Sequence, residues 1–148
     1  EQMASGRALG RLGQAAARLR AGSAIARVAG DGPVTGHHVS LAAREGDVAA
    51  VGVFEEVGRW LGEGIAGLVN VLDPEIVVVG GGVAEEGELL LAPARQAFAN
   101  AVEAPEHRPE VPLVPAALGG DAGAIGAAAL ALDLDLPPTN PAAPAGGR

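Results

Sequence analysis

Three consecutive glycines, Gly80, Gly81 and Gly82, have the clearest chemical use in this chain, because they directly follow the apolar run 76–79. Without side chains they let a ligand approach the backbone, whose free N–H groups can then face a nucleotide. The triplet matches neither the GxGxxG fingerprint nor the P-loop pattern, and the sequence has no lysine to reach a phosphate. Two interpretations stay open, a tight turn after a strand and a nucleotide contact.

A second glycine-rich segment, 119–126, contains Asp121 after a glycine pair. A helix N-terminus beside such a pair could receive an anion. Aspartate is also a favoured N-cap, and capping alone accounts for its presence. We therefore predict that Asp121 caps a helix, and that Gly123 and Gly126 permit close helix packing.

The other polar residues form no recognisable catalytic or metal-binding set. His37 and His38 lie in the turn-rich stretch 29–40, which predicts a loop, and His107 is distant in sequence. Three such histidines without carboxylates at ligand spacing do not predict a metal site. The adjacent pairs 55–56 and 85–86 are glutamates, and neighbours on a helix diverge by about 100°, so we interpret them as solvated.

Composition excludes several classes of protein. The chain has 148 residues, a formal net charge of −8 and scattered arginines, which argues against a nucleic-acid surface. It has no cysteine, so no disulfide, thiolate nucleophile or cysteine-bound zinc can form. No apolar run approaches the roughly 20 residues that cross a bilayer, so we expect no membrane partner.

The elements that must position the glycines are predicted from hydrophobic spacing. The predicted helices cover residues 5–20, 41–44, 48–72, 91–102 and 122–132. Asp47 is expected to cap the long third helix and Asp73-Pro74 to end it. Its apolar face is predicted from seven residues: Val51, Phe54, Val57, Leu61, Ile65, Leu68 and Leu72.

Two short strands are predicted. The run 76–79 is β-branched without alternation, which predicts a strand buried on both faces of a covered sheet. Residues 111–114, interrupted by Pro112, predict an edge or irregular strand. Alternating helices and strands indicate an α/β domain, and two strands are too few for a core, so we expect a piece of a longer protein. Residues 133–148, rich in Pro, Ala and Gly, predict a disordered tail.

Four segments together resemble the bacterial glucokinases of the ROK family: 1–9, 57–62, 68–83 and 117–127. The most specific is Asn70-x-x-Asp73-Pro74-Glu75 followed by the glycine triplet. The resemblance covers residues 1 to 132 and implies an α/β fold, the C-terminal portion of the large domain of an actin/hexokinase-like (ribonuclease H-like) ATPase domain.

The resemblance implies a kinase that transfers phosphate from Mg-ATP to the 6-hydroxyl of glucose. Gly80, Gly81, Gly82 and Val83 would lie along the nucleotide. Glu1 would match the last residue of the family motif Cys-x-Cys-Gly-x-x-Gly-Cys-x-Glu and bind sugar hydroxyls. The zinc-binding cysteines, the catalytic aspartate and the Asp-x-Gly-x-Thr phosphate loop are not in this sequence, so we expect the chain alone to be inactive and no catalytic residue within it.

The same resemblance implies a cytoplasmic protein that forms a homodimer or higher homo-oligomer. It leaves an alternative parent, a ROK sugar-responsive transcriptional repressor, in which a helix-turn-helix precedes the kinase-like domains. The matches over 1–9 and 57–62 favour the kinase.

Overall fold

A computed structural model describes residues 2–20 and 22–132 of the chain. The predicted tail, 133–148, lies outside the described residues. In chain order, the elements are α1 (Gly6–Leu19), α2 (Ala24–Ala29), α3 (Gly36–Arg44), α4 (Val48–Leu72), β1 (Val77–Val79), the 3-10 turn η1 (Ala84–Glu86), α5 (Glu88–Ala101), η2 (Pro105–His107), β2 (Leu113–Pro115), η3 (Gly119–Asp121) and α6 (Ala122–Ala131).

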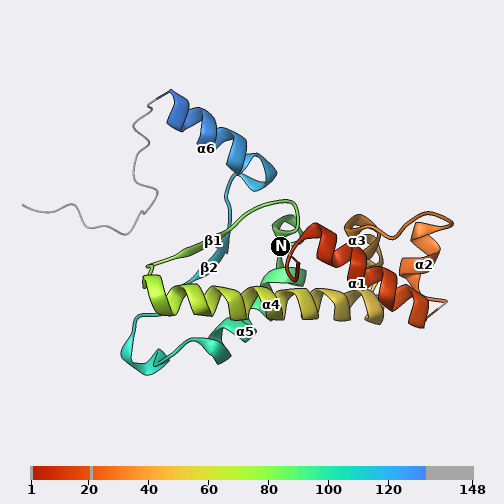
Figure 1. The fold of residues 1–148 in the computed structure, drawn as a ribbon, viewed down its shortest axis with the longest axis horizontal. Helices are drawn as coiled ribbons and strands as arrows, with labels where there is room; N and C mark the ends of the chain where they lie inside the picture. The colour runs from red at the N-terminus through yellow and green to blue at the C-terminus, as the bar shows by residue number, and fades with distance from the viewer. Residues whose placement is uncertain (1, 21, 133–148) are drawn as a thin grey trace, which may run out of the picture.

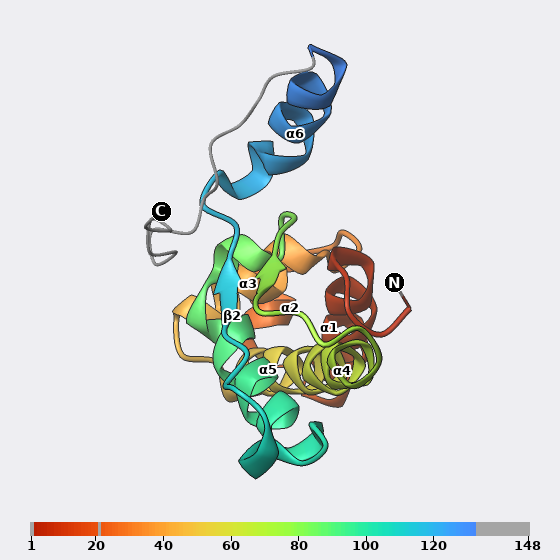
Figure 2. The same ribbon diagram turned by 90° about the vertical axis from the view of Figure 1, so that its left-hand side faces the viewer.

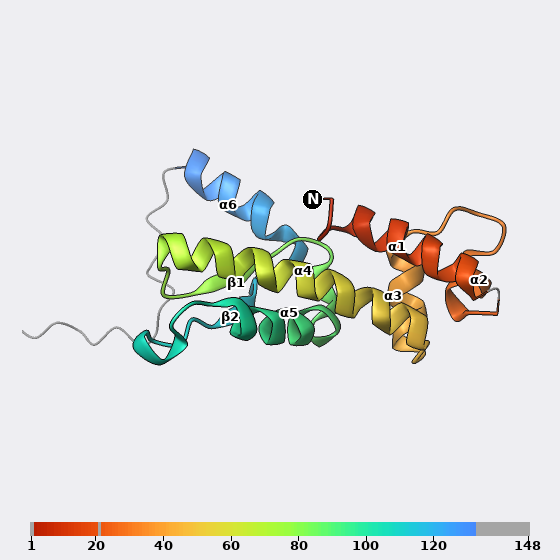
Figure 3. The ribbon, with the colours of Figure 1, turned by 60° about the horizontal axis from the view of Figure 1, so that its bottom comes forward.

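The long helix α4 is the axis of the molecule (Figure 1). Helices α1, α2 and α3 gather at its N-terminal half, whereas β1 and β2 lie beside its C-terminal half, and α5 runs along it (Figures 1 and 3). Helix α6 projects away from the rest (Figure 2). Among the described residues, no helix is both long and apolar enough to cross a membrane.

The predicted ends of α4 are confirmed. Asp47 accepts hydrogen bonds from the N–H of Ala50 (2.9 Å), in the first turn of α4, and of Ala24 (2.7 Å), at the start of α2. At the other end Asp73 has a left-handed backbone (φ 45°) immediately before Pro74, which stops the helix. One carboxylate therefore caps α4 and also accepts the first N–H of α2, whose own N-cap is Ser23.

Two glycines of α4 let α5 approach closely. A Cβ at Gly62 would lie 2.2 Å from the carbonyl oxygen of Ala94, and a Cβ at Gly58 would lie 2.6 Å from Cγ of Pro93. The sequence predicts a helix from residue 91 with Pro93 in its first turn, but α5 begins at Glu88, so Pro93 lies inside the helix. Its ring occupies the space that a side chain at position 58 would take.

The core has two parts. The larger joins α1–α4 around the fully buried Phe54, and the smaller lies between α4, α5 and β2. Leu68 and Leu72, predicted on the buried face of α4, are 61% and 70% exposed. The prediction is wrong there because small residues, Gly62 and Ala66, form the face that packs on α5.

The two strands pair in parallel, with Val77 opposite Leu113 and Val79 opposite Pro115. The prediction of a sheet covered on both faces is wrong for the described residues, because Val78 is 59% exposed. Val77 and Val79 face the smaller core, but no described element covers the other face.

The predicted loop over 29–40 is confirmed for residues 30–35 and wrong for residues 36–40, which are helical. α2 extends to Ala29, and α3 begins at Gly36, so His37 and His38 belong to its first turn. The Nδ1 atom of His38 accepts a hydrogen bond from the N–H of Thr35 (3.3 Å), which satisfies a donor at the helix start. Turn-forming residues here thus precede a helix rather than replace it.

Candidate functional site

The structure brings the two predicted glycine-rich segments together. Because β1 and β2 are parallel neighbours, the residues that follow them meet at one edge of the sheet. The Ala116 N–H donates to the carbonyl oxygen of Val79 (2.9 Å) and extends the pairing to this edge. A pocket of about 250 Å³ lies here, lined by Val79, Gly80, Gly81, Ala84, Glu85, Gly87, Pro115, Ala116 and Gly119.

Gly81 forms the tight turn that one of the two interpretations predicts. Its φ of +91° lies in the left-handed region that favours glycine, and its carbonyl oxygen accepts from the N–H of Ala84 (2.9 Å). A Cβ at Gly81 or Gly82 would have no described atom within 4 Å. The turn is therefore confirmed, and the space beside its backbone is open.

Val83 anchors the loop to the larger core. Its side chain is half-buried, and its Cγ2 lies 3.7 Å from the position of a Cβ at Gly6, the first residue of α1. On this side of the loop a second pocket, of about 330 Å³, is lined by Gly80, Gly81, Gly82 and Val83 together with the 4–6 segment. The loop thus has a pocket on each side.

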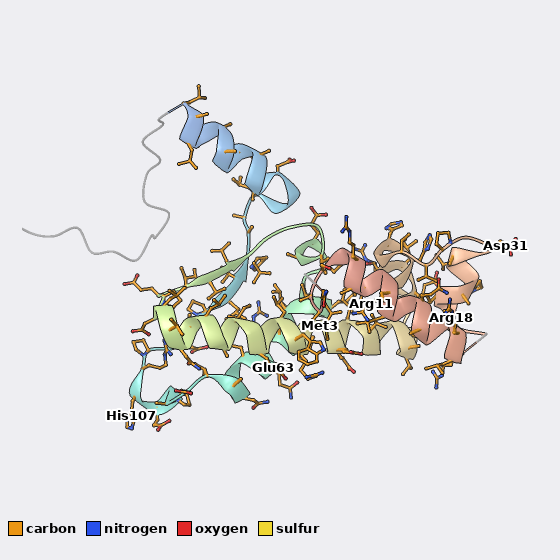
Figure 4. All side chains as sticks on the ribbon, in the orientation of Figure 1. Met3, Arg11, Arg18, Asp31, Glu63 and His107 are labelled. Carbon is orange, nitrogen blue, oxygen red and sulfur yellow. The ribbon has the colours of Figure 1, made fainter. Side chains whose placement is uncertain are left out.

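Glu1 lies outside the described residues. The segment that follows it is held to α1, because the Nη2 of Arg11 donates to the carbonyl oxygen of Gln2 (2.9 Å). Figure 4 shows Met3 near Arg11. The pocket of about 330 Å³ is lined by Ala4, Ser5 and Gly6 on one side and on the other by residues 80–83, which we call the glycine loop.

The predicted N-cap at Asp121 is wrong. Its side chain makes no capping hydrogen bond, and its backbone (φ −84°, ψ −8°) is near-helical, whereas an N-cap is extended. The reason is that η3 continues directly into α6. A Cβ at Gly123 or Gly126 would meet no described atom within 4 Å, so these glycines serve no close packing among the described residues.

The histidines lie in two separate parts of the structure. The three histidines do not converge, because His107 in η2 lies at the opposite end of the molecule from α3 (Figures 1 and 4). The described residues contain no group of three His, Asp or Glu side chains that could hold a metal ion.

Glu86 forms an ion pair with Arg44 (2.9 Å), whereas Glu85 lines the pocket of about 250 Å³. The prediction that both glutamates are solvated is confirmed for Glu85, which is exposed, and wrong for Glu86, whose side chain is 14% exposed. That Glu85 lines a pocket was not predicted, although its position three residues after the triplet was a signal.

Comparison with known sequences identifies the family. The profile of the ROK family matches residues 1–134. The glucokinase of Streptomyces coelicolor is 40% identical over 139 residues, which cover 91% of this chain and 44% of that protein. The N-acetylglucosamine repressor of Escherichia coli O157:H7 is 38% identical over 92 residues, 62% of this chain. The chain thus spans less than half the length of these relatives.

A solved structure supports the same family assignment. The ROK family glucokinase of Streptomyces griseus, crystallised with glucose and AMPPNP, is 45% identical and superposes with a TM-score of 0.79 over 88% of this chain and 43% of that one. The described residues therefore have the α/β fold of part of an actin/hexokinase-like ATPase domain, as the resemblance implied. By sequence and by structure, the chain belongs to the ROK family.

Proposed function

We propose that the complete product of the gene encoding this chain is a glucokinase, which transfers the terminal phosphate of ATP to the 6-hydroxyl of glucose. The observation that supports this most is the convergence of two glycine-rich segments on one pocket at the edge of a parallel strand pair. Ligands of open α/β sheets bind at this edge. The similarity to glucokinases over 91% of the chain supports the same reaction.

The nucleotide would lie against Gly80, Gly81, Gly82 and Val83. Gly81 and Gly82 have open space where side chains would be, so a ligand can approach their backbone atoms closely. Val83 would act through its backbone, since its side chain packs toward α1. The four residues would therefore form a wall of the site and position the nucleotide without taking part in bond making.

Glu1 would bind the sugar. A carboxylate accepts charge-assisted hydrogen bonds from hydroxyl groups, and these are stronger than neutral ones. The segment from Ala4 to Gly6 shares a pocket with the glycine loop, which is consistent with a sugar site close to the nucleotide site.

In this proposal, the described residues of this chain bind no metal ion directly. The chain has no cysteine, and its described residues form no three-ligand cluster, so they do not fit a zinc site. Magnesium would arrive with the nucleotide phosphates, where it neutralises charge during phosphoryl transfer. The base that accepts the sugar proton would also come from outside this chain.

We also propose that residues 1–132 form the C-terminal portion of the large domain of the complete protein and that residues 133–148 are a tail. The proposal also includes a cytoplasmic location and a homodimer or higher homo-oligomer. A transcriptional repressor is the rival parent, since a repressor is among the relatives. The kinase is favoured because the glucokinase similarity extends over 139 residues and the repressor similarity over 92.

The test is an assay of the purified complete protein with glucose and Mg-ATP, coupled to NADPH formation through glucose-6-phosphate dehydrogenase. We expect turnover that depends on both substrates. A protein that forms no glucose 6-phosphate but binds DNA in a sugar-dependent manner would contradict the proposal and favour the repressor.

A further inference from the structure

Glu85 lies directly over the second glycine-rich segment. Its Oε1 is 2.5 Å from where a Cβ at Gly120 would be, and 4.0 Å from where a Cβ at Gly119 would be. The carboxylate can occupy this place only because the segment has no side chains there. It therefore bridges the ends of β1 and β2 and lines the pocket of about 250 Å³ between them.

Glu85 is exposed, and its carboxylate is paired with no cation among the described residues. Its neighbour Glu86 is paired with Arg44 (2.9 Å) and its side chain is only 14% exposed. No described residue forms a hydrogen bond or an ion pair with the side chain of Glu85. An unpaired carboxylate beside open glycine backbone is an acceptor for a donor that comes with the ligand.

The charge of Glu85 restricts which part of a nucleotide lies beside it. A carboxylate repels phosphate oxygens, whereas neutral hydroxyls are good donors to it. Two neighbouring hydroxyls can each donate to one carboxylate oxygen, and the ribose of a nucleotide presents such a pair. The same chemistry is used where an acidic residue binds the ribose of a dinucleotide.

We propose that Glu85 accepts hydrogen bonds from the 2′- and 3′-hydroxyls of the ribose and so selects ATP over its deoxy analogues. This inference rests on the proposed nucleotide site and adds the residue that determines sugar specificity within the nucleotide. The glycine loop would then contact the phosphate side of the nucleotide, and Glu85 its nucleoside side.

The experiment measures binding, so that it does not depend on the phosphorylation of glucose. ATP, 2′-deoxy-ATP and 3′-deoxy-ATP are titrated by calorimetry into the complete protein and its Glu85→Ala and Glu85→Gln variants. Glu56→Ala is the matched control, because Glu56 is an exposed glutamate on α4 that lines neither glycine-loop pocket. Melting temperatures of all variants check folding.

We expect the unmodified protein and Glu56→Ala to bind ATP at least about tenfold more tightly than either deoxy analogue. In Glu85→Ala the three affinities should agree within about twofold, and Glu85→Gln should lie between. A preference for ATP that persists in Glu85→Ala, or no preference in the unmodified protein, would overturn the inference.

These outcomes separate the two proposals. A protein that phosphorylates glucose but binds the three nucleotides equally contradicts the role of Glu85 alone. A protein whose preference depends on Glu85 but which phosphorylates no glucose supports the role of Glu85 and contradicts the proposed reaction.

Discussion

At the scale of single residues, Gly81 is where the proposed nucleotide contact can be tested most directly. Its φ of +91° disfavours any β-branched residue, and the space beside it is open to the pocket. We predict that Gly81→Val raises the KM for ATP about tenfold or more, because the side chain blocks nucleotide approach, with little change in the KM for glucose. Steady-state kinetics of the complete protein measure both constants.

Backbone strain alone could also weaken the protein, at a cost of about 1–3 kcal/mol. Gly46 supplies the matched control, since its φ is +83°, its Cβ position is open and it lies between α3 and α4, outside the glycine loop. Gly46→Val should lower the melting temperature and leave the KM for ATP unchanged. Equal effects on ATP and glucose in Gly81→Val would indicate that Gly81 only forms a turn.

The proposed role of Glu1 is tested by measuring the affinity for glucose. We predict that Glu1→Gln weakens glucose binding about 10- to 100-fold and ATP binding far less, because the amide keeps the size but loses the charge and one acceptor oxygen. Isothermal titration of the complete protein with glucose gives the affinity, and a melting curve shows whether folding is affected. An unchanged glucose Kd with a lower melting temperature would remove Glu1 from the sugar site.

At the scale of elements, the contact between α4 and α5 depends on which glycines face it. A Cβ at Gly62 would lie 2.2 Å from the carbonyl oxygen of Ala94, whereas a Cβ at Gly64 would meet no described atom within 4 Å. We predict that Gly62→Ala destabilises the protein by more than about 2 kcal/mol, since the helices must separate. Gly64→Ala should stabilise it by about 0.5–1 kcal/mol, the helix propensity difference.

Chemical denaturation of the two alanine variants measures this contrast. The variants make the same chemical change two residues apart on one helix, so composition and propensity are matched. Similar stabilities for the two would show that α4 and α5 do not pack as closely as the structure indicates.

Asp47 links α2 to α4 and makes this junction sensitive to acid. Burial raises the pKa of its carboxyl group, but hydrogen bonds from the N–H groups of Ala24, Ala50 and Ala49 outweigh burial, and the pKa lies below its ordinary 3.8. The ionised carboxylate therefore stabilises the fold fully well above pH 3.8, and this contribution is lost as the pH falls from 3.8 through the lower folded value.

We predict that Asp47→Ala costs about 1–3 kcal/mol at pH 7, because the N-cap of α4 and the hydrogen bond to the first N–H of α2 are lost. Asp47→Asn should cost less, since asparagine also caps, and it should lose less stability than the unmodified protein as the pH falls below 3.8. Melting curves from about pH 7 down to about pH 2, a range that includes the region below 3.8 where the carboxylate takes up its proton, measure this. An unmodified protein with the same acid sensitivity as Asp47→Asn would contradict the role of this carboxylate.

At the scale of the whole molecule, the proposed function gives the described residues only one wall of the site. Phosphoryl transfer needs a base, a phosphate cradle and a metal ion in one place, and none of the described clusters provides the last. We predict that the 148-residue chain alone shows no glucose- and ATP-dependent turnover. The coupled NADPH assay with a tag-only control measures it, and turnover above that control would contradict the prediction.

The sequence by itself determined the ends of the longest helix and the family. Asp47 caps α4 and Asp73-Pro74 ends it, because caps and helix stops depend on hydrogen bonds and sterics within a few residues. The glycine triplet and the stretch before it indicated the ROK family, and the family is confirmed.

Only the tertiary structure decided which residues meet. The parallel pairing of β1 with β2 joins segments more than thirty residues apart, and it sets the exposed Glu85 over Gly120, a neighbour that the sequence did not predict. It also decided that Gly62 faces α5 and that Val78 is exposed. Hydrophobic periodicity reports that a face is buried, but the partner of that face is set by long-range packing, to which small residues such as glycine contribute without a hydrophobic signal.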